Sequence, residues 1–170
     1  MEKSKVNKKL ILIIVIAVLV VAAIAVLVVS LVKPSYKKQI KEFAKACESE
    51  EKMEKYVEKY VNLKAIYAMR ESEEAADFED EYKKAKKSDY KDDEFVDEVK
   101  ETFNYYVSDD TEIKVKEIGK LEKCEEEDME MFKVADVTFE IKEDDDSEEV
   151  DMQALFYKGQ IILIGTDDMF

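Results

Sequence analysis

The chain of 170 residues carries 27 Lys plus Arg against 42 Asp plus Glu, a formal net charge of −15, and it contains no histidine. An acidic surface repels a phosphate backbone, so we expect no nucleic-acid partner. Without histidine the chain lacks the most common general base and zinc ligand, and its three glycines and one proline provide no glycine-rich phosphate loop.

Residues 10–32 form one uninterrupted apolar segment with a single hydroxyl, at Ser30, and no charge. At about 1.5 Å per residue a helix of this length crosses a hydrocarbon core of about 30 Å, and in lipid only a helix satisfies its own backbone. We predict a transmembrane helix from Leu10 to Val32 behind a short basic cytoplasmic tail, residues 1–9. The alternative is a cleaved signal peptide at Ala23-Ile24-Ala25, but the apolar run exceeds the usual core of about 7–15 residues.

The flanking lysines do not set the orientation of this helix, because four lie on each side. They are Lys3, Lys5, Lys8 and Lys9 before it and Lys33, Lys37, Lys38 and Lys41 after it. A short basic tail ahead of a single apolar segment is typical of a signal anchor, and residues 33–170 have a net charge of −18. We predict a single-pass protein of the cell membrane with its C-terminal domain extracytoplasmic. The lysines after the helix are expected to lie against the lipid headgroups.

Residues 33–110 have the apolar spacing of three to four helices. Pro34 suits the first turn of a helix whose apolar positions recur every three and four residues. Those positions are Ile40, Phe43, Ala44 and Cys47. A second amphipathic stretch runs from about Glu50 to Met69 with Tyr56, Tyr60 and Tyr67 on its apolar face.

A third helix is expected after Ala75, with Phe78 and Tyr82 on its apolar side. A fourth begins near Asp92, because Asp92-Asp93-Glu94 supplies a cap and favourable dipole charge before the next apolar positions. Those positions are Phe95, Val96, Val99, Phe103 and Tyr106.

After residue 110 the apolar period changes to two, which is typical of half-buried strands. We predict four strands in residues 111–170 that form an antiparallel meander, with the helices packed on this curved sheet in one α+β domain. Their apolar positions are Ile113 and Val115, then Ala135 to Ile141, then Val150 to Phe156, then Ile161 to Gly165. Tyr157-Lys158-Gly159-Gln160 indicates a two-residue hairpin turn.

Residues that face the core on one strand must lie opposite residues that face the core on the neighbouring strand. This requirement predicts a register for each hairpin. The expected partners are Phe156 with Ile161 and Ala154 with Leu163 in the last hairpin, Ile141 with Val150 in the acidic one, and Glu117 with Lys133 in the first. Glu117 and Lys133 are the charged side chains at inward positions of this arrangement. We expect them to neutralise each other.

Helices followed by an antiparallel meander behind one membrane anchor resemble the extracytoplasmic domains of the nuclear-transport-factor-2-like, or ketosteroid-isomerase-like, superfamily. The resemblance covers residues 35–166 and includes the closing hairpin from Leu155 to Ile164. Relatives commonly carry a tryptophan after the glycine turn, where this chain has Ile161 and Ile162. The resemblance implies a sheet wrapped by helices into a cone, which holds a ligand or a core. Membrane-anchored bacterial members are mostly of unknown function.

An isomerase-like site needs a carboxylate base inside the cone and a phenol or protonated acid as oxyanion donor. Because Glu117 is expected to be paired, and tyrosines at helical spacing are more often core residues, we predict no catalysis and no cofactor. The residues expected to line a pocket or form the core are Tyr56, Tyr60, Tyr67, Phe103, Tyr106, Phe139 and Phe156.

Three acidic runs raise the possibility of a calcium site, because hard cations bind several oxygens. They are residues 92–94, 125–128 and 144–149, and none has the spacing of a calcium loop with its central glycine. We interpret them as solvated turns or caps and predict no metal. Cys47 and Cys124 permit one disulfide in an exported domain, but Cys47 lies on an apolar helix face, which favours two free thiols.

The sequence therefore predicts a non-catalytic binding or scaffolding domain at the outer face of the membrane. Its partners are the bilayer, through Leu10 to Val32, and another membrane or envelope protein. The alternative is a cone-pocket enzyme or carrier for a small apolar molecule. A filled core with an exposed apolar patch favours the first; an apolar cavity inside the cone favours the second.

Overall fold

The computed structural model describes residues 34–108, 110–125, 129–143 and 146–166. The chain divides into two units, Met1–Pro34 and Ser35–Phe170. The basic tail and the expected transmembrane helix, residues 10–32, lie outside the described residues. Within the described ranges no helix combines the length and the apolar composition needed to span a bilayer.

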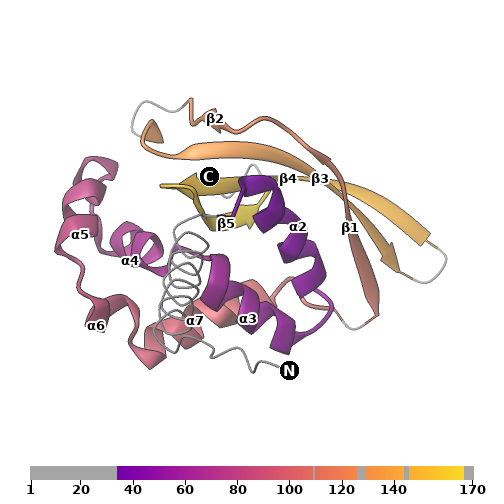
Figure 1. Ribbon diagram of the computed structural model, residues 1–170, viewed down its shortest axis with the longest axis horizontal. Helices are drawn as coiled ribbons and strands as arrows, with labels where there is room; N and C mark the ends of the chain where they lie inside the picture. Colours follow the sequence, from indigo (N-terminus) through magenta and orange to yellow (C-terminus); the bar gives the residue numbers. More distant parts are fainter. Residues whose placement is uncertain (1–33, 109, 126–128, 144–145, 167–170) are drawn as a thin grey trace, which may run out of the picture. The chain divides into compact units, whose positions relative to one another are not determined.

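The second unit begins with helices and ends with a sheet, which confirms the α+β class. The helices of the described residues are α2 (Tyr36–Ala46), α3 (Glu50–Tyr60), α4 (Leu63–Glu71), the 3-10 helix η1 (Ala75–Asp77), α5 (Phe78–Lys84), α6 (Lys87–Tyr90) and α7 (Asp93–Asn104). The strands are β1 (Thr111–Ile118), β2 (Glu122–Lys123), β3 (Lys133–Glu143), β4 (Asp146–Tyr157) and β5 (Gln160–Gly165). Figure 1 shows α2, α3 and α7 gathered on one side of the sheet.

The helix expected from Glu50 to Met69 is two helices, so that prediction was wrong. Asn62 separates them: its side-chain oxygen accepts from Ala65 N at 3.1 Å and caps α4. The backbone N–H of Asn62 donates to Ile161 O at 2.7 Å, and its side-chain amide donates to Tyr157 O at 3.4 Å. Backbone polar groups between α3 and α4 therefore bond to the last hairpin instead of continuing one helix. The separation into two helices depends on this contact with β4 and β5, which helical periodicity in the sequence does not reveal.

The other expected helices are present. Pro34 lies before α2 and not in its first turn as expected. Ser35 caps this helix, and its hydroxyl accepts from Lys38 N at 3.3 Å. Asp92 caps α7 by accepting from Glu94 N at 3.2 Å, as the acidic cap predicted. The single-turn helix α6 was not predicted.

The sheet is antiparallel with strand order β1-β3-β4-β5. The short strand β2, which was not predicted, pairs with the first residues of β3. Strands β2 and β1 thus lie on the same side of β3, β2 beside its start and β1 beside the rest of it. The sheet has five strands instead of the expected four.

All three expected hairpin registers require correction, and in the first hairpin Glu117 pairs with Thr138 instead of Lys133. In the last hairpin Phe156 pairs with Ile161 as predicted, but an irregularity beyond it pairs Ala154 with Ile164 instead of Leu163. In the acidic hairpin Ile141 pairs with Glu148 instead of Val150. A displacement by two residues leaves the same side chains on the same face, so alternation alone does not detect it.

The main core lies between the helices and one face of the sheet. It is formed by Ile40, Phe43 and Ala44 of α2, Met53, Tyr56, Val57 and Tyr60 of α3, Phe95, Val99 and Phe103 of α7, and Ala135, Val137, Phe139, Ala154, Phe156, Ile161 and Ile164 of the sheet. Leu155 and Tyr157 alternate along β4 with Ala154 and Phe156 of the main core, so they point to the other face of the sheet. They belong to a second cluster, which also contains Ile162, Phe132, Ala65, Ala68 and Phe78. The end of β4 is thus buried on both faces, and α4 and α5 supply the second cover.

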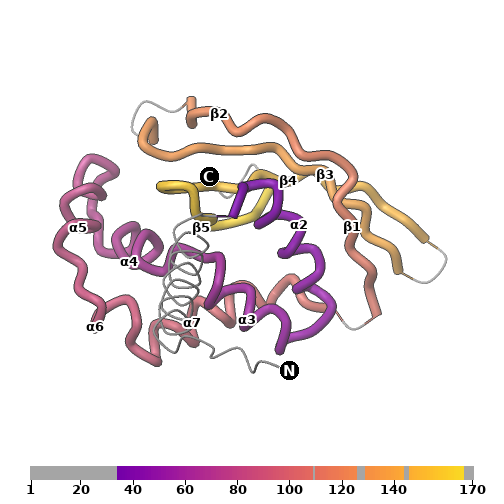
Figure 2. The backbone as a smooth tube through the Cα atoms, in the orientation of Figure 1, coloured from indigo at the N-terminus to yellow at the C-terminus, as the bar shows by residue number. Residues whose placement is uncertain are grey.

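The first helix of the domain is fastened to its last hairpin, and Figure 2 shows these distant parts of the chain together. The fully buried Gln39 donates from Nε2 to Gly159 O at 2.9 Å and accepts from Ile161 N at 3.0 Å. The hairpin turn itself has positive φ at Lys158 (49°) and Gly159 (79°), the left-handed pair that a tight two-residue turn requires. Gln39 therefore fixes α2 against the turn that ends β4.

Candidate functional site

The charged pair expected inside the domain does not form. Glu117 lies opposite Thr138, after an irregularity in β1, and Lys133 lies opposite Phe156 on β4 and Lys123 on β2. Both side chains are exposed. The expectation of a neutralised inward pair was wrong because Glu117 lies opposite a residue of β3 that is five positions from the predicted partner.

The residues expected to line a pocket or core are brought together as packed aromatic rings. Tyr56, Tyr60, Phe103, Phe139 and Phe156 are buried, and Tyr67 and Tyr106 are partly buried against the same cluster. Phe43, at their centre, makes edge contacts with the four rings of Tyr56, Phe103, Tyr106 and Phe139 at centroid distances of 5.5 to 6.4 Å. These rings pack between the helices and the face of the sheet that meets them.

A narrow groove opens at the end of this face, beside the C-terminus of α7. Its volume is about 200 Å³, and it is lined by Tyr105, Tyr106, Val107, Ser108, Thr111, Ile113, Phe139, Ile141, Met152 and the edge of Phe43. Tyr105 is 87% exposed, which is unusual for a large apolar side chain. The groove is an apolar surface feature of a strongly charged domain.

A second hollow, of about 340 Å³, lies between α2 and α3. Lys45, Lys52, Lys55 and Lys59 surround it with Glu42 and Glu48, while Ala46, Tyr56 and Tyr60 provide the rest of its lining. Lys45 Nζ lies 2.8 Å from Glu42 Oε1, and Lys52 pairs with Glu48. The local charge of the lining is positive, opposite to that of the whole chain.

The electrostatics of this hollow follow from its short ion pairs. The hydrogen bond from Lys45 lowers the pKa of Glu42, and the same bond raises the pKa of Lys45. Burial raises the pKa of Tyr56 well above its ordinary value. At neutral pH the tyrosine is therefore a neutral hydrogen-bond donor and the lysine remains charged.

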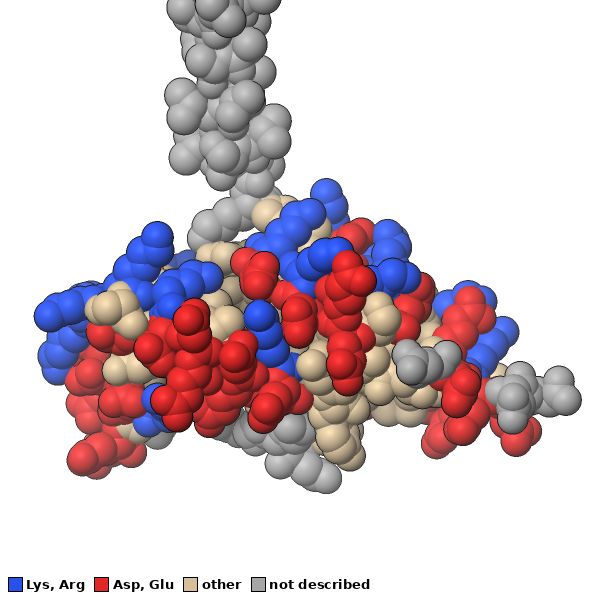
Figure 3. Space-filling model, turned by 90° about the horizontal axis from the view of Figure 1, so that it is seen from below, with Lys and Arg blue, Asp and Glu red and all other residues tan. Residues whose placement is uncertain are grey.

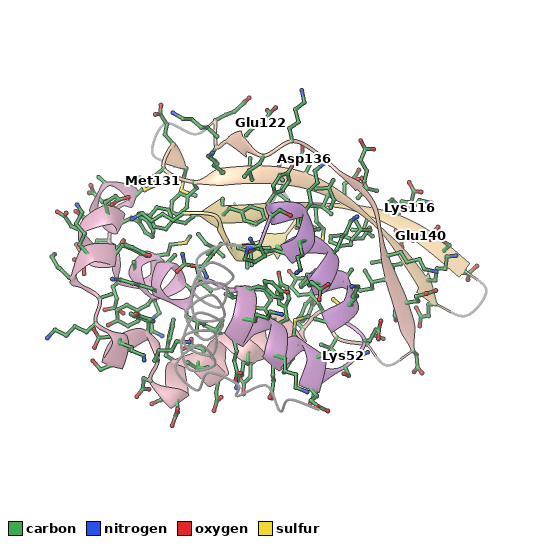
Figure 4. All side chains as sticks on the ribbon, viewed as in Figure 1. Lys52, Lys116, Glu122, Met131, Asp136 and Glu140 are labelled. Atoms are coloured by element: carbon green, nitrogen blue, oxygen red, sulfur yellow. The ribbon has the colours of Figure 1, made fainter. Side chains whose placement is uncertain are left out.

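Charge is distributed unevenly over the domain. In the view of Figure 3 the Lys and Arg side chains gather along the upper margin, and Asp and Glu cover much of the remaining face. On the outer face of the sheet Lys116 lies 3.2 Å from Glu140 and 3.6 Å from Glu149, and Figure 4 shows Lys116 and Glu140 side by side. The Lys116 pairing lowers the pKa of Glu140. Lys116 thus offsets part of the negative charge on this face of the sheet. The ion pairs lie on the surface and do not form a binding cavity.

The two cysteines are free thiols, as the apolar position of Cys47 predicted. Cys47 is 1% exposed, and burial raises the pKa of its thiol to about 12. Cys124 is partly exposed. In the described part of the chain no group of three Cys, Asp or Glu side chains is arranged to hold a metal ion.

The α2–α3 hollow was not predicted, although the sequence contains a signal for it. Lys52, Lys55 and Lys59 recur at three and four residues and therefore share one side of α3, next to Tyr56 and Tyr60. The groove beside Tyr105 depends on where α7 ends relative to the sheet, which local sequence does not specify. Comparison of the chain with models of known protein families, with curated protein sequences and with solved structures finds no match.

Proposed function

We propose that this chain is a single-pass membrane protein whose acidic α+β domain binds a protein partner at the outer face of the membrane, without catalysing a reaction. The observation that supports this proposal most directly is the filled interior. Phe43 and the four rings around it occupy the space in which a cone-pocket enzyme holds its substrate.

The apolar groove beside Tyr105 is the proposed contact surface for the partner. A small-molecule pocket usually has a volume of about 300–1,000 Å³ and buries most of its ligand. At about 200 Å³ the groove is below this range, whereas an exposed tyrosine at its rim is typical of a protein contact. The size and exposure of this groove therefore favour a protein contact at this place over a small apolar ligand.

Residues 10–32 supply the membrane anchor in this proposal, with residues 1–9 on the cytoplasmic side and the domain outside. The sequence argument for it is the length and uncharged composition of the segment. We further propose that the domain belongs to the nuclear-transport-factor-2-like superfamily and has the cone-like form of that fold. The order of helices followed by an antiparallel sheet supports this membership.

The test places a photo-crosslinking amino acid at Tyr105 in the full chain, within its native membranes. The matched control places it at Lys114, an exposed position of β1 that does not line the groove. We expect a discrete crosslinked protein from position 105 and none from position 114. Equal crosslinking from both positions, or a small apolar molecule that remains bound to the purified full chain in native mass spectrometry, would contradict the proposal.

A further inference from the structure

The first part of β4 has a neighbouring strand on one side only. Strand β3 pairs with β4 along its whole length from Asp146, whereas β5 pairs only with Gln153 to Tyr157. Figure 1 shows β3 and β4 continuing together beyond the end of β5. Among the described residues no strand pairs with the other side of β4 from Asp146 to Met152. This open edge presents backbone N–H and C=O groups to which a further strand can bond.

The groove beside Tyr105 lies where this open edge begins. Met152, which lines the groove, is the residue of β4 directly before the pairs with β5. Tyr106, which also lines it, donates its hydroxyl to Ile164 O at 2.8 Å, close to the end of β5. Side chains that share a face on neighbouring strands lie about 4.5–5.5 Å apart. A strand added to the open edge would therefore place an inward side chain beside Met152, at the groove.

The open edge is acidic. Residues 146–152 contain four carboxylates and no basic side chain. Glu149 lies 3.6 Å from Lys116 Nζ, but Glu148 and Asp151 have no ion pair among the described residues. Asp151 and Glu149 are exposed on the outer face of the sheet, and Met152 between the inward positions lines the groove. The edge thus combines apolar contacts on its inner face with negative charge on its outer face.

This charge disfavours two occupants that the chain itself offers. A second copy paired through the same edge would bring its carboxylates against those of the first, and like charges opposite each other destabilise a sheet. Residues 167–170 lie outside the described residues. Extending the observed β4–β5 register, in which Gln153 pairs with Gly165, would set Asp167 opposite Asp151. A strand from another protein, with basic side chains, matches the edge better.

We propose that the partner contributes an extended segment that pairs with β4 between Asp146 and Met152 as an additional strand. Alternate side chains of this segment are apolar and face the groove, and the side chains between them are basic and face Glu149 and Asp151. In this mode of recognition main-chain hydrogen bonds provide affinity and alternate side chains provide specificity. The inference rests on the proposed function, because it specifies how a protein partner contacts the groove beside Tyr105.

The probe is a synthetic heptapeptide of alternating lysine and valine, titrated into the full chain in an uncharged detergent at constant ionic strength. The control peptide has the same composition with its valines adjacent, so it carries the same charge without an apolar face. By calorimetry we expect the alternating peptide to bind roughly tenfold more tightly than the control. Equal affinities would show attraction by charge alone and would overturn the proposal.

Two N-methylated forms of the alternating peptide test the backbone pairing. One form is methylated on the lysine backbone nitrogens and the other on the valine backbone nitrogens. Because the N–H groups of successive residues point to opposite edges of a strand, only one of the two sets can face β4. We expect one form to lose roughly tenfold or more in affinity and the other to bind like the unmethylated peptide. Equal affinities of the two forms would refute pairing along the edge.

A matched pair of variants tests the charge at the edge. Asp151 accepts a hydrogen bond from Thr138 at 2.7 Å, and Asp136, on the inner strand β3, accepts one from Gln153 at 3.3 Å. Both carboxylates are exposed on the same face, and Asn keeps an acceptor oxygen in each place. Asp151→Asn should weaken binding of the alternating peptide about two- to fivefold, and Asp136→Asn should leave it nearly unchanged. Equal effects of the two variants would contradict the placement on β4.

Crosslinking in native membranes separates this inference from the proposed function. A photo-crosslinking amino acid at Ser147, an exposed residue of the open edge, should capture the same protein as one at Tyr105. Capture from position 105 without capture from position 147 would overturn the added strand and leave the proposed function standing. Absence of capture from position 105 would contradict the proposed function, whereas the peptide titrations test the open edge by themselves.

Discussion

Single polar side chains determine where the helices of this domain meet its last hairpin. Among the residues that the structure describes, Gln39 and Asn62 are the buried polar ones, and each bonds backbone groups of the last hairpin. Their positions in the sequence are unremarkable, since Gln39 lies in a lysine-rich helix start and Asn62 lies inside a helical apolar pattern. Their roles follow from tertiary contacts and were not predictable, unlike that of Cys47, whose apolar spacing indicated its burial.

Gln39→Ala should lower the free energy of unfolding by about 1–3 kcal/mol, because it leaves Gly159 O and Ile161 N without the partner that Gln39 provides inside the protein. The measurement is urea unfolding followed by circular dichroism. Lys41→Ala, an exposed change in the same helix, serves as the control and should alter stability by less than about 0.5 kcal/mol. Equal stability of the two variants would show that Gln39 does not fasten α2 to the hairpin.

At the level of elements, the apolar period predicted the type of nearly every segment but not the pairing between strands. Alternation identified which face of β3 and β4 is buried, and it placed the turn at Lys158-Gly159 correctly. It gave the wrong register for β1, because displacement by an even number of residues preserves the face and because β1 contains an irregularity near Lys116. Burial of both faces of β4 had a signal in the continuous apolar run Ala154–Tyr157.

The observed register changes what is expected of Glu117 and Lys133. Because both side chains are exposed and lie apart on the sheet, Glu117→Gln and Lys133→Met should each change stability by less than about 0.5 kcal/mol, and their effects should add. Thermal melts of the two single variants and the double variant measure this. A large loss in either single variant that the double variant recovers would restore the inward pair and contradict the register.

For the whole molecule, the buried tyrosines link stability to high pH. Burial raises the pKa values of Tyr56, Tyr106 and Tyr157 above the ordinary value, with a hydrogen bond to Glu79 adding to the effect at Tyr157. The folded state therefore holds protons that the unfolded chain releases near pH 10. The free energy of unfolding should be insensitive to these groups below about pH 10 and should fall as the pH rises further.

This dependence is measured by unfolding at a series of alkaline pH values, with tyrosinate absorbance recorded in parallel. The buried tyrosines should ionise only as the domain unfolds, and Tyr56→Phe should reduce the slope of stability against pH. Gradual ionisation of all tyrosines in a domain that keeps its circular dichroism spectrum would show that the aromatic interior is open to solvent. That result would favour the pocket alternative.

The proposed topology places the domain outside the cell membrane, and the two thiols of the chain provide the most direct test of it. Cys124 is partly exposed, whereas Cys47 is buried and its thiol has a pKa raised to about 12. A membrane-impermeant maleimide added to intact cells in which the outer face of the cell membrane is accessible should label one thiol per chain. Cys124→Ser should abolish the labelling and Cys47→Ser should preserve it. Labelling of Cys124 only after the membrane is permeabilised would place the domain in the cytoplasm and contradict the account.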